Sequence, residues 1–105
     1  MAYTDQFKGK KQPILIQFYA DWCPPCRMLS PIVKEVAETY ADQITVEQIN
    51  VDTNQDIAAE FGVRSIPAMF VLQETNIAWQ HVGYMPLSEL TRSIEHSTHI
   101  TLTRS

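Results

Sequence analysis

The sequence predicts an α/β fold of three layers, in which helices cover both faces of a central mixed sheet of about four strands. The first observation is the order of the hydrophobic patterns: strand, helix, strand, helix, strand, strand, helix. A strand–helix–strand crossover implies a parallel pair, and a later hairpin adds antiparallel strands to the same sheet. The second observation is size, because 105 residues with 45% hydrophobic content suffice for one buried core. We therefore expect a single domain over residues 1–105.

The first half of the chain carries the strand–helix–strand pattern. Residues 1–13 are mostly polar and predict a short lead-in. The nearly continuous apolar run of residues 14–20 is typical of a strand that is covered on both faces. After Cys23, apolar side chains recur at helical spacing as far as Tyr40, and Pro31 is expected to bend this helix. Residues 44–51 predict the second strand.

The second half begins with a short helix and ends with a longer one. Residues 54–61 predict the short helix, and the apolar runs 68–72 and 77–82 predict a hairpin. Pro86 suits the first position of a last helix, because that position needs no backbone donor. The tail, residues 97–105, shows no helical period and is expected to be loosely held.

Composition excludes several classes of protein. Lys and Arg total 8 against 12 Asp and Glu, for a formal net charge of −4, so binding to nucleic acid or to an anionic membrane is not expected. The sequence has no apolar run approaching the ~18–20 residues of a spanning helix. The first residues lack the basic start and apolar middle of a signal peptide, which predicts a cytoplasmic protein.

The chemistry-bearing motif is Trp22-Cys23-Pro24-Pro25-Cys26, placed between the first strand and the long helix. A thiol in the first turn of a helix faces unpaired N–H groups and the positive end of the helix dipole. Both favour the thiolate, which is the reactive species. With two residues between them, the sulfurs can form and break a disulfide without large backbone movement. Cys23 is predicted to attack a substrate disulfide, and Cys26 to resolve the mixed disulfide.

Two other roles for the cysteine pair are less favoured. Half of a zinc site would need a second pair of ligands, but the chain has only 2 Cys, and nothing in the sequence places His81, His96 or His99 beside them. A purely structural disulfide is uncommon in a reducing compartment, and such a short loop stabilises little. We therefore expect no metal site.

Beyond these arguments, the sequence resembles the thioredoxin family. The resemblance spans residues 14–94 and rests on four segments in the family's order and spacing: FYADWCPPCRMLSP, INVD, VRSIPA and VG. It implies the thioredoxin-like fold and the reduction of protein disulfides by dithiol–disulfide exchange. It further implies disulfide-containing proteins as substrates, a thioredoxin reductase-like electron donor, and no cofactor besides the redox-active disulfide.

The resemblance also implies a surface that receives the substrate. Its members are Trp22, Pro24, Ile66, Pro67 and Gly83, and Ile66-Pro67 matches a cis-proline step that faces the cysteines. A cis bond would expose the backbone of Ile66 for antiparallel pairing with a substrate chain. Without the resemblance, a trans proline at the start of an edge strand would be the default.

Four polar residues are expected around the cysteines. By similarity, Asp52 is predicted to bond the Trp22 indole, and Arg27 to support local anion stability. Gln17 and Gln48 stand where the family usually places a buried Asp and its Lys partner. The absence of both charges avoids a penalty, because one of them alone would be a buried unpaired charge at a cost of roughly 3–5 kcal/mol.

The two glutamines change the expected chemistry. They can bond each other or a water, since each amide carries a donor and an acceptor. The alternative is that they do not meet. Neither can accept the proton of Cys26, so the usual internal base is missing and resolution would depend on water or on the leaving thiolate.

The N-terminus also departs from the family, which begins with a strand and a helix. Residues 1–13 are too few for both, so we expect a short helix over residues 3–7 and a shortened or missing first strand. The result would be an exposed sheet edge and a monomer or weak dimer.

The sequence therefore predicts a thiol–disulfide oxidoreductase that reduces protein disulfides. The alternatives are a thiol oxidase or isomerase of the same fold, which runs the same chemistry in another direction, and a thioredoxin-like module that binds without turnover.

Overall fold

The computed structural model describes residues 2–104, and Met1 and Ser105 of the predicted domain lie outside this range. The order of elements is the predicted one, and each predicted strand boundary differs from the observed one by no more than one residue. The elements are the 3₁₀ helix η1 (Tyr3–Phe7), β1 (Ile14–Tyr19), α1 (Pro24–Thr39), β2 (Thr45–Asn50), α2 (Gln55–Glu60), β3 (Ala68–Gln73), β4 (Asn76–Val82) and α3 (Leu87–Thr98).

The four strands form one mixed sheet in the order β2-β1-β3-β4. β1 pairs with β2 in parallel and with β3 in antiparallel orientation, and β3 and β4 form the hairpin. The register places Gln17 of β1 directly beside Gln48 of β2. The predicted mixed sheet is confirmed, and within residues 2–104 strands β2 and β4 are its two edges.

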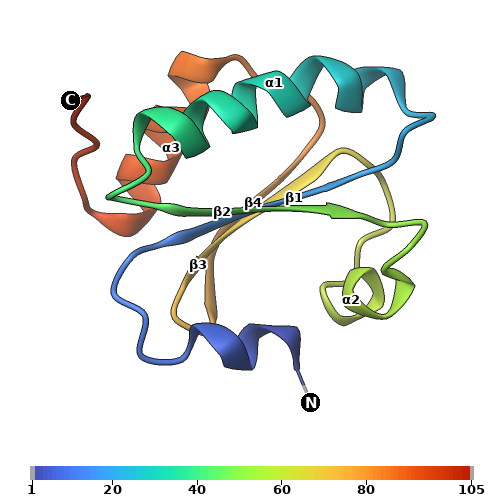
Figure 1. Cartoon of the computed structure of the whole chain (residues 1–105), viewed down its shortest axis with the longest axis horizontal. Helices are drawn as coiled ribbons and strands as arrows, with labels where there is room; N and C mark the ends of the chain where they lie inside the picture. The colour runs from blue at the N-terminus through green and yellow to red at the C-terminus, as the bar shows by residue number, and fades with distance from the viewer. Residues whose placement is uncertain (1, 105) are drawn as a thin grey trace.

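Helices α1 and α3 cover one face of the sheet, and η1 and α2 lie against the other (Figure 1). Side chains of β1 point alternately to the two faces. Leu15 packs with the cluster beneath α1 and α3, whereas Ile14, Ile16 and Phe18 pack on the η1 and α2 side. All four are fully buried. Burial on both faces explains why this strand is an almost continuous apolar run.

The N-terminal segment forms the expected short helix, and Tyr3 fixes it to two other elements. The Tyr3 ring lies edge-on to Phe61, with centroids 6.2 Å apart, and its backbone N–H donates to Oε1 of Glu60 at 2.8 Å. The Tyr3 hydroxyl donates to Oε1 of Glu47 on β2 at 3.4 Å. Burial and, secondarily, this carboxylate raise the pKa of Tyr3 to about 12.

The C-terminal segment differs from the prediction in two respects. Helix α3 extends to Thr98, which is buried, and begins at Leu87 with Pro86 as its N-cap. The residues after it are tied by hydrogen bonds, in contrast to the loosely held tail that was predicted. Leu102 N–H donates to Oε2 of Glu95 at 2.8 Å.

A second contact holds the tail at Thr103, whose N–H donates to Oε1 of Gln43 and whose carbonyl accepts from Nε2 of Gln43, both at 2.7 Å. The absence of a helical period does not exclude order, because side-chain amides satisfy the backbone groups here. None of the helices in residues 2–104 is long and apolar enough to cross a membrane.

Candidate active site

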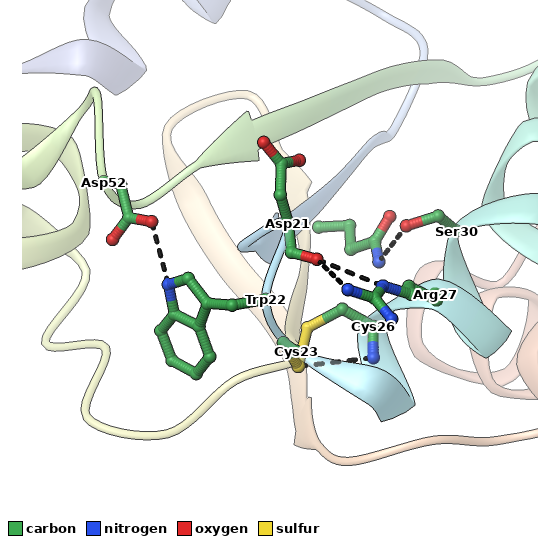
Figure 2. Close-up of a disulfide and its surroundings, with 8 residues drawn as sticks. Asp21, Trp22, Cys23, Cys26, Arg27, Ser30 and Asp52 are labelled. Atoms are coloured by element: carbon green, nitrogen blue, oxygen red, sulfur yellow. Dashed lines mark hydrogen bonds between the residues drawn. A yellow bond between two sulfur atoms is a disulfide. The ribbon is translucent and has the colours of Figure 1, made fainter.

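The two cysteines meet at the start of α1. Cys23 is the N-cap of this helix, Pro24 and Pro25 form its first turn, and Cys26 follows. Proline is favourable there because the first helical N–H groups have no intrahelical partner to lose. The sulfurs of Cys23 and Cys26 form a disulfide, with 5.3 Å between the Cα atoms. The backbone N–H of Cys26 donates to Sγ of Cys23 at 3.3 Å (Figure 2). Both residues are nearly inaccessible, with exposed fractions of 3% and 1%.

One side of the disulfide carries the predicted surface of Trp22, Pro24, Ile66, Pro67 and Gly83, which we call the docking surface. The Ile66–Pro67 bond is cis, as predicted. Ile66 packs against the buried cluster that contains the two cysteines. Gly83 N–H donates to the Pro67 carbonyl at 2.8 Å, and its φ of +104° is one that L side chains rarely adopt. Trp22 and Pro24 are exposed beside the disulfide.

A groove of about 210 Å³ runs along this surface between Trp22 and Ile66. Its other walls are apolar apart from one cation, and are formed by Val51, Ala58, Val63 and Arg64. These four residues were not identified from the sequence, because they come from α2 and its flanking loops rather than from a motif.

Asp52 fixes the position of Trp22. Its Oδ2 accepts a hydrogen bond from the indole Nε1 at 2.9 Å, as predicted (Figure 2). The indole is otherwise largely open to solvent, since Trp22 is 63% exposed. A large apolar ring beside the disulfide is therefore held in place without being buried.

Arg27 is directed at the backbone before the cysteines. Its Nε and Nη2 donate to the Asp21 carbonyl at 3.1 and 2.8 Å (Figure 2). The guanidinium therefore ties the loop that precedes Cys23 to the first turn of α1.

The other side of the disulfide carries the two glutamines, and they meet. Nε2 of Gln48 donates to Oε1 of Gln17 at 2.8 Å, so the alternative that they stay apart is wrong. Gln17 is completely buried, and its Nε2 donates to Oγ of Ser30 at 3.2 Å. Nε2 of Gln48 also lies 3.4 Å from the Ser30 carbonyl. These bonds satisfy the buried amide without any charge.

Ser30 was not identified from the sequence. A signal was present, because Ser30 lies four residues after Cys26 and so on the same face of the helix. A polar residue at that position in an otherwise apolar stripe marks where the buried Gln17 finds a partner.

A pocket of about 540 Å³ opens on this side, and we call it the rear pocket. It shares no lining residue with the docking surface. Its walls include Asp21, Cys26, Arg27, Ser30, Lys34 and Gln48. In residues 2–104 no three or more His, Cys, Asp or Glu side chains are grouped so that they could hold a metal ion.

Comparison with known proteins decides the family. The family model for thioredoxin matches residues 1–96. The thioredoxin of Alicyclobacillus acidocaldarius is 40% identical over 88 residues, which are 84% of this chain and 83% of that protein. The thioredoxin of Pyropia yezoensis is 44% identical over 93 residues, covering 89% and 87% of the two chains. The chain belongs to the thioredoxin family.

The solved structures agree with this assignment. A mutant thioredoxin from Halobacterium salinarum superposes with a TM-score of 0.80 and 34% identity, over 92% of this chain and 84% of that one. The fold is thioredoxin-like. Thioredoxins are protein-disulfide reductases, and this chain, with its bonded cysteine pair at the start of α1, is a thiol–disulfide oxidoreductase of that family.

Proposed function

We propose that Cys23 is the nucleophile of this enzyme and that Cys26 is the resolving thiol. The observation that carries the assignment is the placement of the disulfide at the N-terminus of α1, where Cys23 Sγ accepts the Cys26 N–H. In the reduced enzyme, the same donor and the positive end of the helix favour the Cys23 thiolate. Cys26 lies one turn inside, with a lower exposed fraction.

The reaction then has two displacement steps. The Cys23 thiolate attacks a substrate disulfide, forming a mixed disulfide and releasing one substrate thiolate. Cys26 loses its proton and attacks Sγ of Cys23, which re-forms the disulfide and releases the second substrate sulfur with its electron pair. The substrate gains two electrons, and the enzyme must be reduced again before the next cycle.

The docking surface is proposed to hold the substrate chain during these steps. Its exposed Trp22 and half-buried Ile66 offer apolar area next to the disulfide, and the backbone of Ile66 is proposed to pair with the substrate backbone. Binding of this kind is largely independent of sequence, because main-chain hydrogen bonds carry the affinity. It suits an enzyme that acts on disulfide-containing proteins of different sequence.

We further propose a thioredoxin reductase-like flavoprotein as electron donor and no cofactor beyond the disulfide itself. The chain is proposed to act in the cytoplasm as one thioredoxin-like domain, monomeric or weakly dimeric. Its acidic balance, with a net charge of −4, supports protein partners over nucleic acid.

The test is the reduction of insulin disulfides with dithiothreitol as donor, comparing the unaltered protein with Cys23→Ser. We expect the variant to lose at least ~10³-fold in catalysed rate, because the sulfur nucleophile is gone. Equal catalysed rates would refute the proposal and assign the nucleophile to Cys26, whereas no catalysed rate in either protein would favour a module that binds without turnover. Titration against glutathione then tests direction, since a potential well above that of glutathione would favour an oxidase or isomerase.

A further inference from the structure

The rear pocket borders Cys26 on a side that is separate from the docking surface. Cys26 is part of its wall, and none of its lining residues belongs to the docking surface or to the groove between Trp22 and Ile66. A substrate chain that contacts the docking surface alone therefore touches no residue of the rear pocket. The volume of about 540 Å³ is far more than the ~30 Å³ that one water occupies.

Cys26 needs a proton acceptor on this side. It is 1% exposed, and burial of that kind disfavours a free thiolate. The proton must leave as Cys26 attacks, and an acceptor close to the sulfur makes that step easier. Two lining residues of the rear pocket, Ser30 and Gln48, are bonded to Nε2 and Oε1 of the buried and neutral Gln17. No group of this network can take up a proton at neutral pH.

The walls of the rear pocket suit a small anion. Two of the lining side chains are cations, Arg27 and Lys34, against one carboxylate, Asp21. The local balance is positive in a protein whose net charge is −4. Ser30 and Gln48 supply polar groups beside Cys26, held in place by their bonds to Gln17.

We propose that the rear pocket binds a small carboxylate anion, which accepts the proton of Cys26 during resolution. This inference rests on the proposed role of Cys26. In this step the S–H bond of Cys26 breaks and its proton goes to the carboxylate. The Cys26 sulfur bonds to Sγ of Cys23, and the substrate sulfur leaves with the electron pair of the broken disulfide. The carboxylic acid then returns its proton to solvent, where the leaving thiolate can take it up. A soluble ion thereby replaces an internal base.

The experiment follows the two thiols of the reduced protein separately with a chromogenic aromatic disulfide in excess. The first release of chromophore reports attack by Cys23, and the second reports resolution by Cys26. Sodium acetate is raised at constant pH, with sodium chloride keeping the ionic strength fixed. We expect the second rate to rise at least about fivefold and then saturate, while the first rate stays unchanged.

Variants locate the effect. Lys34→Gln removes one cation of the rear pocket and is expected to raise the half-saturating acetate concentration about two- to fivefold. Lys10→Gln, an exposed lysine of the N-terminal lead-in, is the matched control and should leave the acetate curve unchanged. The pair Gln17→Asp with Gln48→Lys supplies an internal base and should abolish the acetate dependence. Acetate should also shift the backbone amide signals of Ser30 and Gln48 in nuclear magnetic resonance spectra of the oxidised protein.

Three results would overturn the inference. The rate of the second release could be independent of acetate, it could fall with acetate, or it could rise linearly with acetate to the same extent in the Lys34→Gln variant. Each of these leaves the insulin assay positive, so the proposed function would survive. If the unaltered reduced protein releases no chromophore in either step, in contrast, the proposed function itself is contradicted.

Discussion

The docking surface and the rear pocket flank the same disulfide but differ in how they relate to the family. On the docking surface, the Trp22–Asp52 bond and the cis Ile66–Pro67 bond agree with what the resemblance implied. On the rear side, a hydrogen-bonded pair of neutral amides, Gln17 and Gln48, stands where the family usually has a charged pair. The comparison teaches that the surface proposed to receive the substrate can keep the family's features while the groups proposed to handle the proton change.

The difference has a physical basis. The proposed binding of a substrate chain depends on the backbone geometry and the apolar area of the docking surface. Few substitutions in this surface keep both. Proton handling needs only an acceptor near the sulfur, and solvent can provide one where a pocket is open. The rear side is therefore free to lose its charges, provided that it loses both together.

The largest expected effect separates the two cysteines. Cys26→Ala should lower the turnover rate at least ~10³-fold and leave attack by Cys23 intact, because only the resolving sulfur is removed. Incubation with a disulfide-containing protein should then accumulate a covalent complex that reducing agent releases, visible by mass spectrometry. Cys23→Ala is the control and should accumulate none. If Cys23→Ala accumulates the covalent complex and Cys26→Ala does not, the nucleophile is Cys26 instead.

The second prediction introduces a charge on the rear side. Gln17→Asp places a carboxyl at a fully buried position opposite the neutral Gln48, so its pKa should lie above the ordinary value. We expect the free energy of unfolding at pH 7 to fall by roughly 3–5 kcal/mol, and denaturant unfolding measures it.

Adding Gln48→Lys to Gln17→Asp tests the cause, because it supplies the missing partner. Much of the lost stability should return. If the double variant is no more stable than the single one, the cost comes from packing and not from the unpaired charge.

The third prediction concerns the docking surface. Trp22→Ala removes apolar area that is exposed beside the disulfide and held by Asp52. We expect kcat/KM for a protein disulfide to fall about tenfold, corresponding to ~1.4 kcal/mol, with little change toward a small aromatic disulfide. Parallel assays with the two substrates provide the measurement. A tenfold loss with both would place Trp22 in the chemistry of Cys23 and not in docking.

The smallest expected effect concerns Tyr3, which belongs neither to the docking surface nor to the rear pocket. It gives the baseline against which changes at those two regions are compared. The pKa of Tyr3 is about 12, raised from 10.0 by burial and by Glu47. A raised folded-state pKa means that the contribution to stability is complete below pH 10 and is lost as the pH rises through about 12. Tyr3→Phe should therefore weaken the pH dependence of unfolding between these values. Insulin reduction at neutral pH should stay within twofold, roughly the scatter of a distant surface change.

If Tyr3→Phe changes the rate of insulin reduction at neutral pH by more than twofold, η1 influences the disulfide. The matched comparison is Tyr40→Phe, which keeps the ring at a buried position of the other cluster and lacks the contact to Glu47.

The sequence predicted most of the fold because its strongest signals are local. The apolar run of β1 and the apolar stripe of α1 each follow from burial, on two faces and on one face respectively. The pairing of Gln17 with Gln48 was an open question in the sequence, since a register shift by one residue would have turned one side chain to the other face. The observed register settles it.

The parts that sequence reasoning missed depend on contacts between distant segments. The rear pocket is lined by the end of β1 and the loop after it, by α1 and by Gln48 of β2, and no single segment carries a motif for it. Ser30 gains its role only through the orientation of Gln17. The tail was misjudged for the same reason, because the partner of Thr103 is Gln43, which follows α1 in the chain.

The two hydrogen bonds between Gln43 and Thr103 also connect the segment after α3 to a distant part of the chain. A side-chain amide meets a peptide group at both its donor and its acceptor, much as one strand meets another. Gln43→Ala would remove both bonds to Thr103 and leave Leu102 with its N–H bond to Glu95 and its contact with the hydrophobic cluster. Residues 102–103 thus link α3, through Glu95, to the turn that follows α1, through Gln43.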